Sequence, residues 1–393
     1  MTPFIHMALA LVALPVTVSS AYLLFLTLLS GSTKTPEPST RSLRFDVIVP
    51  AHDEASVISH TVANLKTLDW PPDRFRIVVI ADNCTDETAD LARSGGAEVL
   101  ERHDLTRRGK GYALEHAFAA SRTAGWADAV VVIDADAEVS ANLLEAFAAR
   151  LERGESAVQA HYGVLNPFAS WRTRLITIAK AAFHIVRSRA RERVGLSCGI
   201  RGNGWCVTHR LLTQVPYRAF SLTEDLEYGV DLGLAGFRVA YADEAHSNAD
   251  MASNEQVASK QRQRWESGRF QLIRAKTIPL LIAAARRRSL TCLDLAMDLM
   301  VLPLSYVVLN AFGLIALAGI FYFVNPRFEI WLWIGCANAA VLMIYVLRGW
   351  RLSGIGLQGL ADLGRAPGFL AWKVLLMFNR RKSTEWVRTE RER

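Results

Sequence analysis

Three long apolar stretches constrain the fold of this chain more than any other feature. Residues 3–30, 299–324 and 330–347 contain no Asp, Glu, Lys or Arg. A membrane-spanning helix needs about 20 predominantly apolar residues, a length that the first two stretches exceed and the third approaches. The sequence therefore predicts three transmembrane helices. They account for a hydrophobic content of 51% in a chain of 393 residues, which is slightly high for a purely soluble protein.

The first stretch is interpreted as a retained anchor and not as a cleaved signal peptide. No Lys or Arg precedes its apolar core, and that core is longer than the apolar region of a signal peptide. The flanking cations predict the orientation, because Lys and Arg accumulate on the cytoplasmic side. Cations follow the first stretch (Lys34, Arg41 and Arg44), precede the second (Arg286, Arg287 and Arg288) and follow the third (Arg348 and Arg351). We therefore expect the N-terminus outside and residues from about 33 to 290 in the cytoplasm.

The expected organisation has three parts. They are an N-terminal anchor (1–32), a cytoplasmic domain (33–275), and a C-terminal region (276–393) with two transmembrane helices and a basic cytoplasmic tail. Residues 277–285 and 366–378 are too short to span and carry or border cations, which favours helices in the membrane interface. The net charge of +7 then indicates attraction to anionic membrane lipids, and no nucleic-acid module is recognisable. The five cysteines form no C-x-x-C pair, so neither a zinc site nor a disulfide framework is indicated.

Strand-like and helix-like segments alternate between residues 45 and 151. Four apolar runs read as strands, and they are separated by segments of helical character such as "YALEHAFAAS". This alternation predicts an α/β fold with a mainly parallel, Rossmann-like sheet covered by helices. The four runs are "FDVIVP" from residue 45, "RIVVIA" from 76, "AEVLE" from 97 and "AVVVID" from 129.

Carboxylates follow three of the four predicted strands. Glu54 follows the first in "AHDE", Asp82 follows the second in "DNCTD", and Asp134 and Asp136 follow the fourth in "DAD". Each alone is more typical of a loop or a helix cap than of a ligand site. Ligands of parallel sheets bind beyond the carboxyl ends of the strands, so these acids are expected to meet. Hard oxygen donors that would repel one another suit Mg²⁺ or Mn²⁺, ions that commonly bind substrate phosphates.

The segment "RRGKGYAL" from residue 107 fits neither common phosphate-binding glycine motif. Asp104 stands where a P-loop needs its first glycine, and Gly109 and Gly111 lack the third glycine of a dinucleotide fingerprint. What remains is a helix N-terminus beside Lys110, which suits a phosphate or an acidic cluster. An NAD-type oxidoreductase is correspondingly disfavoured.

A second carboxylate pair opens the segment "SLTEDLEYGVDLGLAG", residues 221–236. This segment reads as a helix with Thr223 as N-cap and with Glu224 and Asp225 in its first turn. Acids at this position are favoured by the helix dipole alone. A functional role requires a carboxylate near an apolar wall, where it takes a proton from an attacking hydroxyl.

The motif "QRQRW" belongs to a helix that a capping box at 253–256 is expected to start. Gln261, Arg264, Trp265 and Gly268 share one helix face at i, i+3, i+4 and i+7, whereas Arg262 and Arg269 point elsewhere. A guanidinium binds phosphate in a bidentate manner and an indole offers a flat apolar surface. A solvated basic helix at a membrane surface is the alternative.

Together, "DAD", "TED" and "QRQRW" resemble the inverting family 2 glycosyltransferases, in particular the membrane-bound branch with cellulose, chitin and hyaluronan synthases and bacterial exopolysaccharide enzymes. The resemblance covers about residues 45–275 and the flanking membrane segments. It implies a GT-A fold, a nucleotide-sugar donor (UDP by family weighting), and a bacterial inner-membrane location.

The resemblance also implies roles for individual residues. Asp225 would be the general base, with Glu224 beside it on the acceptor side, and Asp134 with Asp136 would hold the metal at the diphosphate. The donor side would comprise Glu54, Asp82, Lys110, Asp134, Gln261, Arg264 and Trp265. Trp265 would also border the acceptor, and Trp205 in "RGNGWCV" is either a sugar-stacking surface or a core residue. The roles of His52 and Asp53 stay open, because the family often has an aromatic residue and an asparagine there.

Three functions remain as alternatives at this stage. Three membrane helices are few for a polymer channel, which favours transfer to a lipid-linked or membrane-associated acceptor in exopolysaccharide or glycolipid assembly. A processive polymerase acting as an oligomer and a non-catalytic nucleotide-sugar sensor are the others. Asp294 and Asp298, one turn apart before the second apolar stretch, face an acceptor path or mark the water interface. His246 is interpreted as a structural or solvated loop residue.

Overall fold

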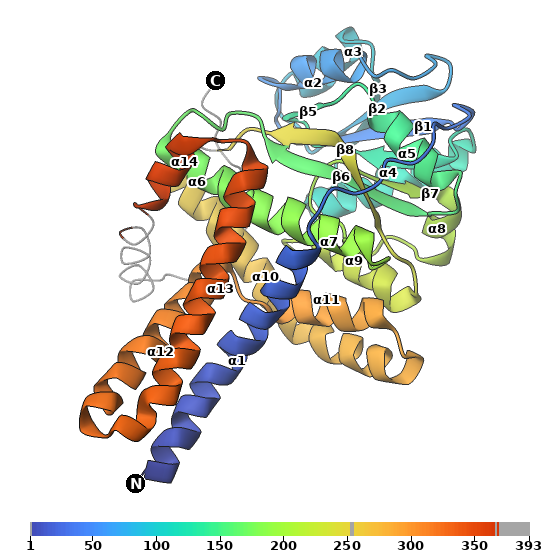
Figure 1. Ribbon diagram of the computed structural model, residues 1–393. Helices are drawn as coiled ribbons and strands as arrows, with labels where there is room; N and C mark the ends of the chain where they lie inside the picture. Colours follow the sequence, from blue (N-terminus) through green and yellow to red (C-terminus); the bar gives the residue numbers. More distant parts are fainter. Residues whose placement is uncertain (1, 252–254, 366–367, 369–393) are drawn as a thin grey trace.

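The chain forms an α/β domain from which three long helices extend (Figure 1). This computed structural model describes residues 2–251, 255–365 and 368. The capping box at 253–256 and the interfacial stretch at 366–378 therefore fall largely outside the described residues. Helices α1 (Thr2–Leu29), α12 (Leu304–Val324) and α13 (Glu329–Ser353) run side by side away from the sheet.

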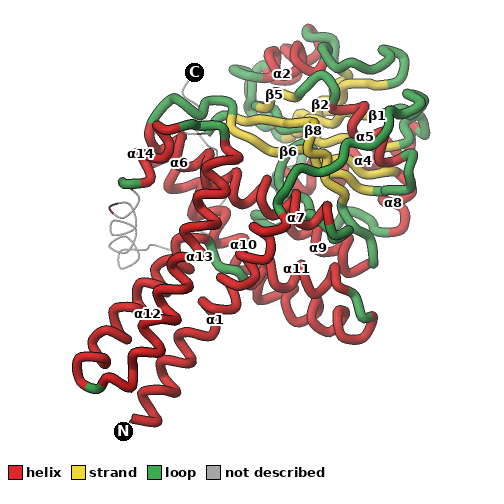
Figure 2. The backbone as a smooth tube through the Cα atoms, viewed as in Figure 1, coloured by secondary structure: helices red, strands yellow, loops and turns green. Residues whose placement is uncertain are grey.

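An eight-stranded sheet forms the core of the α/β domain, with strand order β3-β2-β1-β4-β7-β6-β8-β5 (Figure 2). The first four strands in this order pair in parallel, as do β6 and β8, whereas β7 and β5 pair antiparallel with their neighbours. The mainly parallel α/β fold is confirmed, and the four predicted strands are β1 to β4. The bounds are β1 Phe45–Ala51, β2 Phe75–Asp82, β3 Glu98–Arg102, β4 Ala129–Val132, β5 Ala137–Val139, β6 Ala157–Val164, β7 Trp205–Thr208 and β8 Ala240–Ala249.

Helices cover both faces of this sheet. Val47 and Val49 of β1 pack on one face, whereas Ile48 packs on the other, as the two-residue period of a strand requires. The first face carries α2 (Ile58–Leu65), α3 (Thr88–Ser94) and α5 (Leu143–Leu151). The second carries α4 (Lys110–Ala124), α8 (His209–Gln214) and α9 (Glu224–Ala235). Because both faces are buried, the strands read as continuous apolar runs.

The three long helices are apolar enough to cross a membrane, which confirms the predicted number among the described residues. The second begins at Leu304 and not at residue 299, because Leu299 belongs to α11 (Leu290–Met300) and the chain turns before the N-cap at Pro303. The third is longer than predicted and ends at Ser353. The helices are joined by apolar contacts and by a hydrogen bond from Asn338 Nδ2 to Thr17 Oγ1 (3.0 Å).

Residues 255–287 form one continuous helix, α10 (Glu255–Arg287). Residues 277–285 are helical, as expected, but they form the last part of α10 and not a helix of their own, and the expected boundary at residue 275 falls inside α10. Helix α11 packs against its second half. Three of the remaining described helices lie between β6 and β7: α6 Trp171–Lys180, the π-helix η1 Ala181–Val186 and α7 Arg187–Arg193. The 3₁₀ helix η2 (Pro326–Phe328) joins α12 to α13, and α14 (Leu357–Leu363) follows α13.

Candidate functional site

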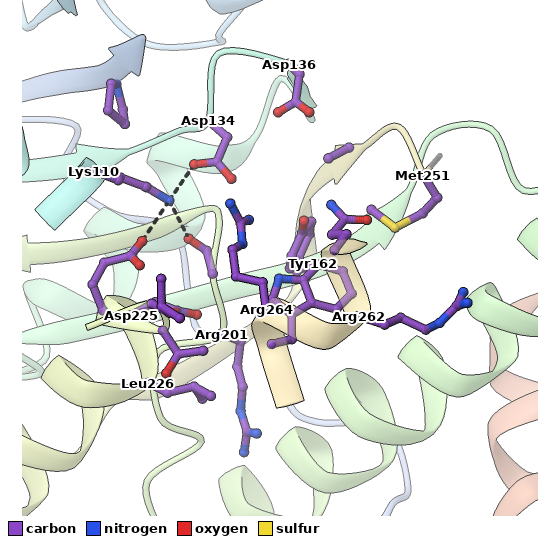
Figure 3. A pocket seen from close by; sticks show the side chains of 18 of the residues that line it. Lys110, Asp134, Asp136, Tyr162, Arg201, Asp225, Leu226, Met251, Arg262 and Arg264 are labelled. Carbon is purple, nitrogen blue, oxygen red and sulfur yellow. Dashed lines mark hydrogen bonds and ion pairs between the residues drawn. The ribbon is translucent and has the colours of Figure 1, made fainter. Parts of the chain in front are cut away.

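One cavity of about 1530 Å³ runs from the carboxyl ends of β1, β2 and β4 to the first turn of α12. Its walls come from the sheet edge, the N-termini of α4 and α9, the middle of α10 and the π-helix η1. The cavity thus joins the α/β domain to the start of a membrane helix. Figure 3 shows the side chains that line it.

The acids that follow the predicted strands all line this cavity. They are Glu54, Asp82, Asp134 and Asp136. Their convergence follows from the parallel pairing of β1 with both β2 and β4, which places three strand ends at one edge. Asp82 is buried and held by Arg102, whose Nη1 donates to Asp82 Oδ1 at 2.5 Å. Arg102 was not identified from the sequence, because it reaches this edge from β3.

Lys110 lies at the centre of the carboxylates. Its Nζ donates to Asp134 Oδ1 at 2.6 Å and lies 3.5 Å from Glu224 Oε1 (Figure 3). Burial would lower the pKa of Lys110, but Asp134 and Glu224 outweigh it and raise this pKa above its ordinary value. Gly111 must lack a side chain, because a Cβ there would lie 2.2 Å from the carbonyl oxygen of Ala219. The segment "RGKG" therefore brings Lys110 to the carboxylates, and its second glycine packs against the backbone at Ala219.

Asp225 has the environment expected of a general base. Thr223 is the N-cap of α9, and Glu224 and Asp225 form its first turn, as predicted. Burial, and secondarily Glu224, raises the pKa of Asp225 to about 7, although Lys110 acts in the opposite direction. Residues with such displaced pKa values in a cleft are candidates for proton transfer near neutral pH.

The "QRQRW" motif lies on α10 opposite these acids. Gln261, Arg264 and Trp265 line the cavity, and Arg264 extends towards Asp134 and Asp136 in Figure 3. Gly268 faces the side chain of Thr223, to which a Cβ would be only 2.6 Å away. This close approach brings α10 onto the N-terminus of α9.

Two other arginines of α10 also border the cavity, although they were expected to point elsewhere. Arg262 extends away from Asp225 in Figure 3. Arg269 is buried at the membrane end of the cavity, next to Val301. The expectation that Arg262 and Arg269 lie outside the site is wrong, because the cavity is long enough to meet more than one face of α10.

Trp205 is a core residue, which corrects its interpretation as a sugar-stacking surface. Its side chain is 1% exposed and packs against Phe118, Tyr217 and Tyr228. It does not belong to the cavity wall. The ring comes from β7, beside β4, and points into the helix layer formed by α4 and α9. An indole with both faces packed offers no surface to a sugar.

Lys180 is a cavity residue that sequence analysis missed. It ends α6 just before the π-helix, and its Nζ lies 3.3 Å from the ring centroid of Tyr162. Burial lowers the pKa of Lys180 to about 7, partly offset by Asp136 and Asp134. Its only sequence signal is a lysine in the otherwise apolar run "LITIAKAAF".

The donor set at the end of β4 fits a divalent cation. Asp134 and Asp136 supply hard carboxylate oxygens to the same cavity, and Lys110 balances part of their charge. A second group, comprising Asp53, Cys84 and Asp86, brings three ligand atoms within 4.8 Å of one another. Burial raises the pKa of the Cys84 thiol, so this second group is a poorer match for Mg²⁺ or Mn²⁺.

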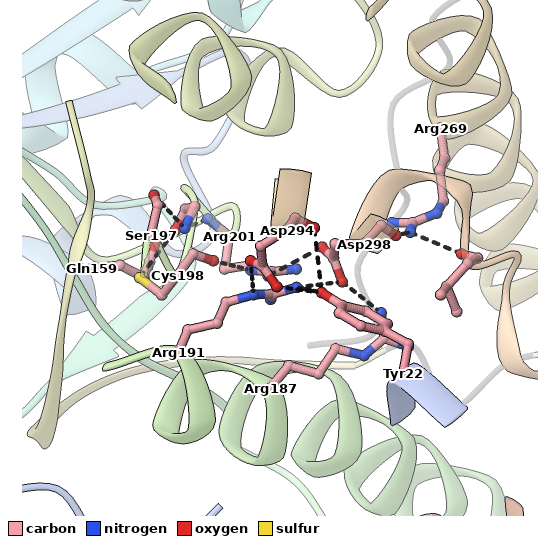
Figure 4. Close-up of polar contacts among 12 residues, drawn as sticks. Tyr22, Gln159, Arg187, Arg191, Ser197, Cys198, Arg201, Arg269, Asp294 and Asp298 are labelled. Atoms are coloured by element: carbon pink, nitrogen blue, oxygen red, sulfur yellow. Dashed lines mark hydrogen bonds and ion pairs between the residues drawn. The ribbon is translucent and has the colours of Figure 1, made fainter. Parts of the chain in front are cut away.

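Three further residues differ from their sequence interpretation. Asp294 and Asp298 neither face an acceptor path nor mark a water interface, because both are buried in ion pairs with arginines (Figure 4). His246 lies on strand β8 and not in a loop. It is exposed, which confirms the solvated alternative, and it does not line the cavity.

Comparison with known proteins identifies relatives of the α/β domain. Residues 43–268 match the family described as glycosyltransferase like family 2. The chain is 25% identical over 238 residues to the probable glycosyltransferase YdaM of Bacillus subtilis (strain 168), covering 57% of this chain and 55% of that protein. It is 25% identical over 232 residues to the beta-monoglucosyldiacylglycerol synthase of Nostoc sp. (strain PCC 7120), covering 57% and 48%. The chain thus spans about half the length of these curated relatives.

A solved structure shares the fold. The mannosyltransferase PcManGT from Pyrobaculum calidifontis, in complex with GDP-Man and Mn²⁺, superimposes with a TM-score of 0.51 and 18% sequence identity. The match covers 87% of this chain and 98% of that one. At this identity the likeness concerns the fold.

Proposed function

The chain belongs to glycosyltransferase family 2, and from this premise we propose that it transfers a sugar from a nucleoside diphosphate to a lipid-linked or membrane-associated saccharide acceptor. The observation that carries the proposal is the continuous cavity. It connects the strand-end acids to Leu302, Pro303 and Leu304, where the second membrane helix begins. A donor from the cytoplasm and an acceptor from the membrane would therefore meet at Asp225.

The proposed reaction is a direct displacement with inversion at the anomeric carbon. Asp225 accepts the proton of the attacking acceptor hydroxyl, and Glu224 lies beside it on the acceptor side. Lys110 and Arg264 provide positive charge at the leaving diphosphate, where charge accumulates in the transition state. Trp265 and Gln261 border the same space on α10, while Glu54 and Asp82 are assigned to the nucleoside.

A divalent ion would complete this arrangement. Asp134 and Asp136 would hold it, and Mg²⁺ or Mn²⁺ would neutralise the diphosphate as it departs. The Mn²⁺ in the structure of the mannosyltransferase PcManGT is consistent with this assignment.

The test is a donor screen with the full chain purified in a nonionic detergent. Release of nucleoside diphosphate is measured for a panel of UDP- and GDP-sugars, with a membrane lipid extract as acceptor and Mg²⁺ or Mn²⁺ as cofactor. We expect one donor to be consumed, with product formation lost in Asp225→Asn. Binding of donor and metal without transfer or hydrolysis would instead support the non-catalytic sensor.

Product size separates single transfer from polymerisation. Labelled donor is incubated with membranes that contain the protein, and the product is extracted into organic solvent. We expect a small glycolipid, because the relative from Nostoc is named as a glycolipid synthase and three membrane helices are few for a polymer channel. Label retained in insoluble polymer would instead support a processive enzyme assembled as an oligomer.

The proposed location is the inner membrane of a bacterium, with the N-terminus outside and the catalytic domain in the cytoplasm. The cation distribution supports this orientation. Reporter fusions at residue 1 and in the loop between α12 and α13 are expected to give periplasmic signals, and a fusion within residues 33–44 a cytoplasmic one. The reverse pattern would refute it.

A further inference from the structure

A buried cluster of charges lies where α1, α7, α10 and α11 meet (Figure 4). Among the described residues it contains four guanidinium groups and two carboxylates, together with the hydroxyl of Tyr22. These residues are Arg187, Arg191, Arg201, Arg269, Asp294 and Asp298. The cluster thus carries more positive than negative charge.

Two of the arginines account for most of the carboxylate contacts. Arg191 Nε donates to Asp294 Oδ2 at 2.7 Å, and its Nη2 lies 2.9 Å from Asp298 Oδ1. Arg187 Nη1 donates to Asp298 Oδ1 at 2.8 Å, while its Nε donates to the hydroxyl of Tyr345 at 2.9 Å. These contacts leave little carboxylate for the other two arginines.

Arg201 and Arg269 are incompletely paired, although they are only 3% and 8% exposed. Arg201 Nε donates to the carbonyl oxygen of Cys198 at 2.7 Å, but its Nη1 has no hydrogen-bond partner and its Nη2 lies 3.3 Å from Asp298. Arg269 donates to the carbonyl oxygens of Asp298 and Val301, and its Nε has no partner. Burial lowers the pKa of both, for Arg269 to about 10. Such uncompensated buried charge is costly in the absence of an anion.

Both arginines line the large cavity at its membrane end. Arg201 extends away from Lys110 and Asp134 in Figure 3, so it is separate from the metal and diphosphate region. Its guanidinium carbon lies 4.6 Å from the centroid of the Phe183 ring, and that of Arg269 lies 5.7 Å from the same centroid. The two cations therefore lie near the same aromatic ring, which itself lines the cavity.

The wall next to these cations is apolar and belongs to the membrane region. Val301, Leu302, Pro303 and Leu304 line the cavity where α12 begins, and Tyr345 of α13 lines it from the other side. A ligand that matches this end needs an anionic head for the guanidinium groups and an apolar tail for the helix starts. Guanidinium groups match phosphate oxygens in charge and geometry.

We propose that Arg201 and Arg269 bind the phosphate of an anionic lipid at the membrane end of the cavity. This inference rests on the proposed transfer to a membrane acceptor and specifies its chemistry: the acceptor lipid carries a phosphate group. Because Gly202 lies next to Asp225, with a Cβ there 3.4 Å from Asp225 Oδ2, a head group held by Arg201 would lie close to the proposed base.

The test compares two lipids with identical tails, dioleoyl phosphatidic acid and dioleoylglycerol. Each is titrated into the full chain in a nonionic detergent, and the apparent Kd is measured from the shift in the thermal unfolding midpoint. We expect the phosphate lipid to bind at least about 10-fold more tightly, since its phosphate forms charge-assisted hydrogen bonds with the guanidinium groups. Arg201→Gln and Arg269→Gln are each expected to remove this preference. Equal binding of both lipids, or variants that retain the preference, would overturn the proposal.

Arg189→Gln is the matched control. Arg189 is a partly buried arginine of the same helix as Arg191, pairs with Asp243 at 2.8 Å and does not line the cavity, so its variant should keep the wild-type preference. Loss of the preference in Arg189→Gln as well would mean that general positive charge attracts the lipid, against the proposal. If Arg201→Gln does not fold, the test relies on Arg201→Lys and Arg269→Gln. The lysine keeps the positive charge but lacks the planar guanidinium group that binds phosphate in a bidentate manner, so both variants should lose the lipid preference.

Inorganic phosphate distinguishes the source of the anion. We expect it to protect far less than phosphatidic acid at equal concentration, and equal protection would overturn the lipid assignment. Failure of the proposed function has a different signature. If no donor is consumed while the phosphate lipid still binds through Arg201, the glycosyl transfer is wrong and the lipid site stands. If sugar is transferred but neither arginine variant changes lipid preference, the site is wrong and the transfer stands.

Discussion

Replacing Asp225 with Asn should stabilise the protein at alkaline pH while abolishing sugar transfer. The pKa of Asp225 is raised from 3.8 to about 7, mainly by burial and then by Glu224. The folded protein therefore holds the proton more tightly than the unfolded chain does. This proton contributes stability that is fully present below pH 3.8 and is lost as the pH rises through about 7. At pH 8 the ionised carboxylate thus opposes folding.

The size of the effect follows from the shift. About three pKa units at about 1.4 kcal/mol each give an upper bound of about 4 kcal/mol. Asp225 is only partly buried, and screening by water reduces the expected gain to about 1–3 kcal/mol. An amide of the same shape avoids the cost of the charge, so Asp225→Asn should unfold about 2–8 °C higher at pH 8.

The assay is thermal unfolding of wild type and Asp225→Asn in the same detergent at pH 8 and at pH 5. The difference between the two proteins should be largest at pH 8 and small at pH 5, where wild-type Asp225 is already protonated. Transfer should fall by about 10²–10⁴-fold, the usual contribution of a general base. Asp231→Asn on the same helix is the activity control, because Asp231 pairs with Lys276 outside the cavity. A variant that is less stable at pH 8, or equally shifted at both pH values, would refute the reasoning.

Three further predictions concern the neighbours of Asp225. Lys110→Met should move the acidic limb of the kcat/KM profile to higher pH by about one unit, because Lys110 lowers the pKa of Asp225; an unchanged limb would contradict the charge assignment. EDTA should abolish transfer, and Asp136→Asn should raise the Mn²⁺ concentration needed for half-maximal rate at least about 10-fold, measured by metal titration; an unchanged requirement would remove Asp136 from the metal site. Trp205→Ala should lower the free energy of unfolding by about 3–5 kcal/mol, because it removes a buried indole. The more conservative Trp205→Phe should leave the acceptor KM unchanged. A raised KM in a stably folded variant would restore Trp205 to the acceptor site.

The sequence predicted the positions of those cavity residues that follow from local rules of secondary structure. Parallel strands end at one edge, so Glu54, Asp82 and Asp134 could be placed together without knowing any contact. Helix α9 begins after Thr223, where the sequence placed its N-cap, although the Thr223 side chain makes no capping hydrogen bond. Helix periodicity placed Gln261, Arg264 and Trp265 at the cavity, but it wrongly excluded Arg262 and Arg269.

The rest depended on contacts between distant segments. Arg102 and Lys180 approach the acids from β3 and α6, and no spacing in the sequence connects them to "DAD". For Trp205 the motif allowed two environments, and only the packing of α4 and α9 onto β7 selects the core. The spacing of Asp294 and Asp298 predicts that they share a helix face. It does not predict that arginines of α7 and α10 cover that face.

The two ends of the cavity favour ligands of opposite charge. Near the strand ends, Asp134 and Asp136 lie together after β4, and a cation would relieve the part of their repulsion that Lys110, Lys180 and Arg264 leave. At the membrane end the arginine cluster exceeds its carboxylates, so an anion has the same effect there. Asp225 lies between the two. A divalent ion bound beside it should lower its pKa below 7, which would raise the ionised fraction of the base when the donor site is occupied. Transfer near neutral pH would then be favoured by metal at one end of the cavity and by phosphate lipid at the other.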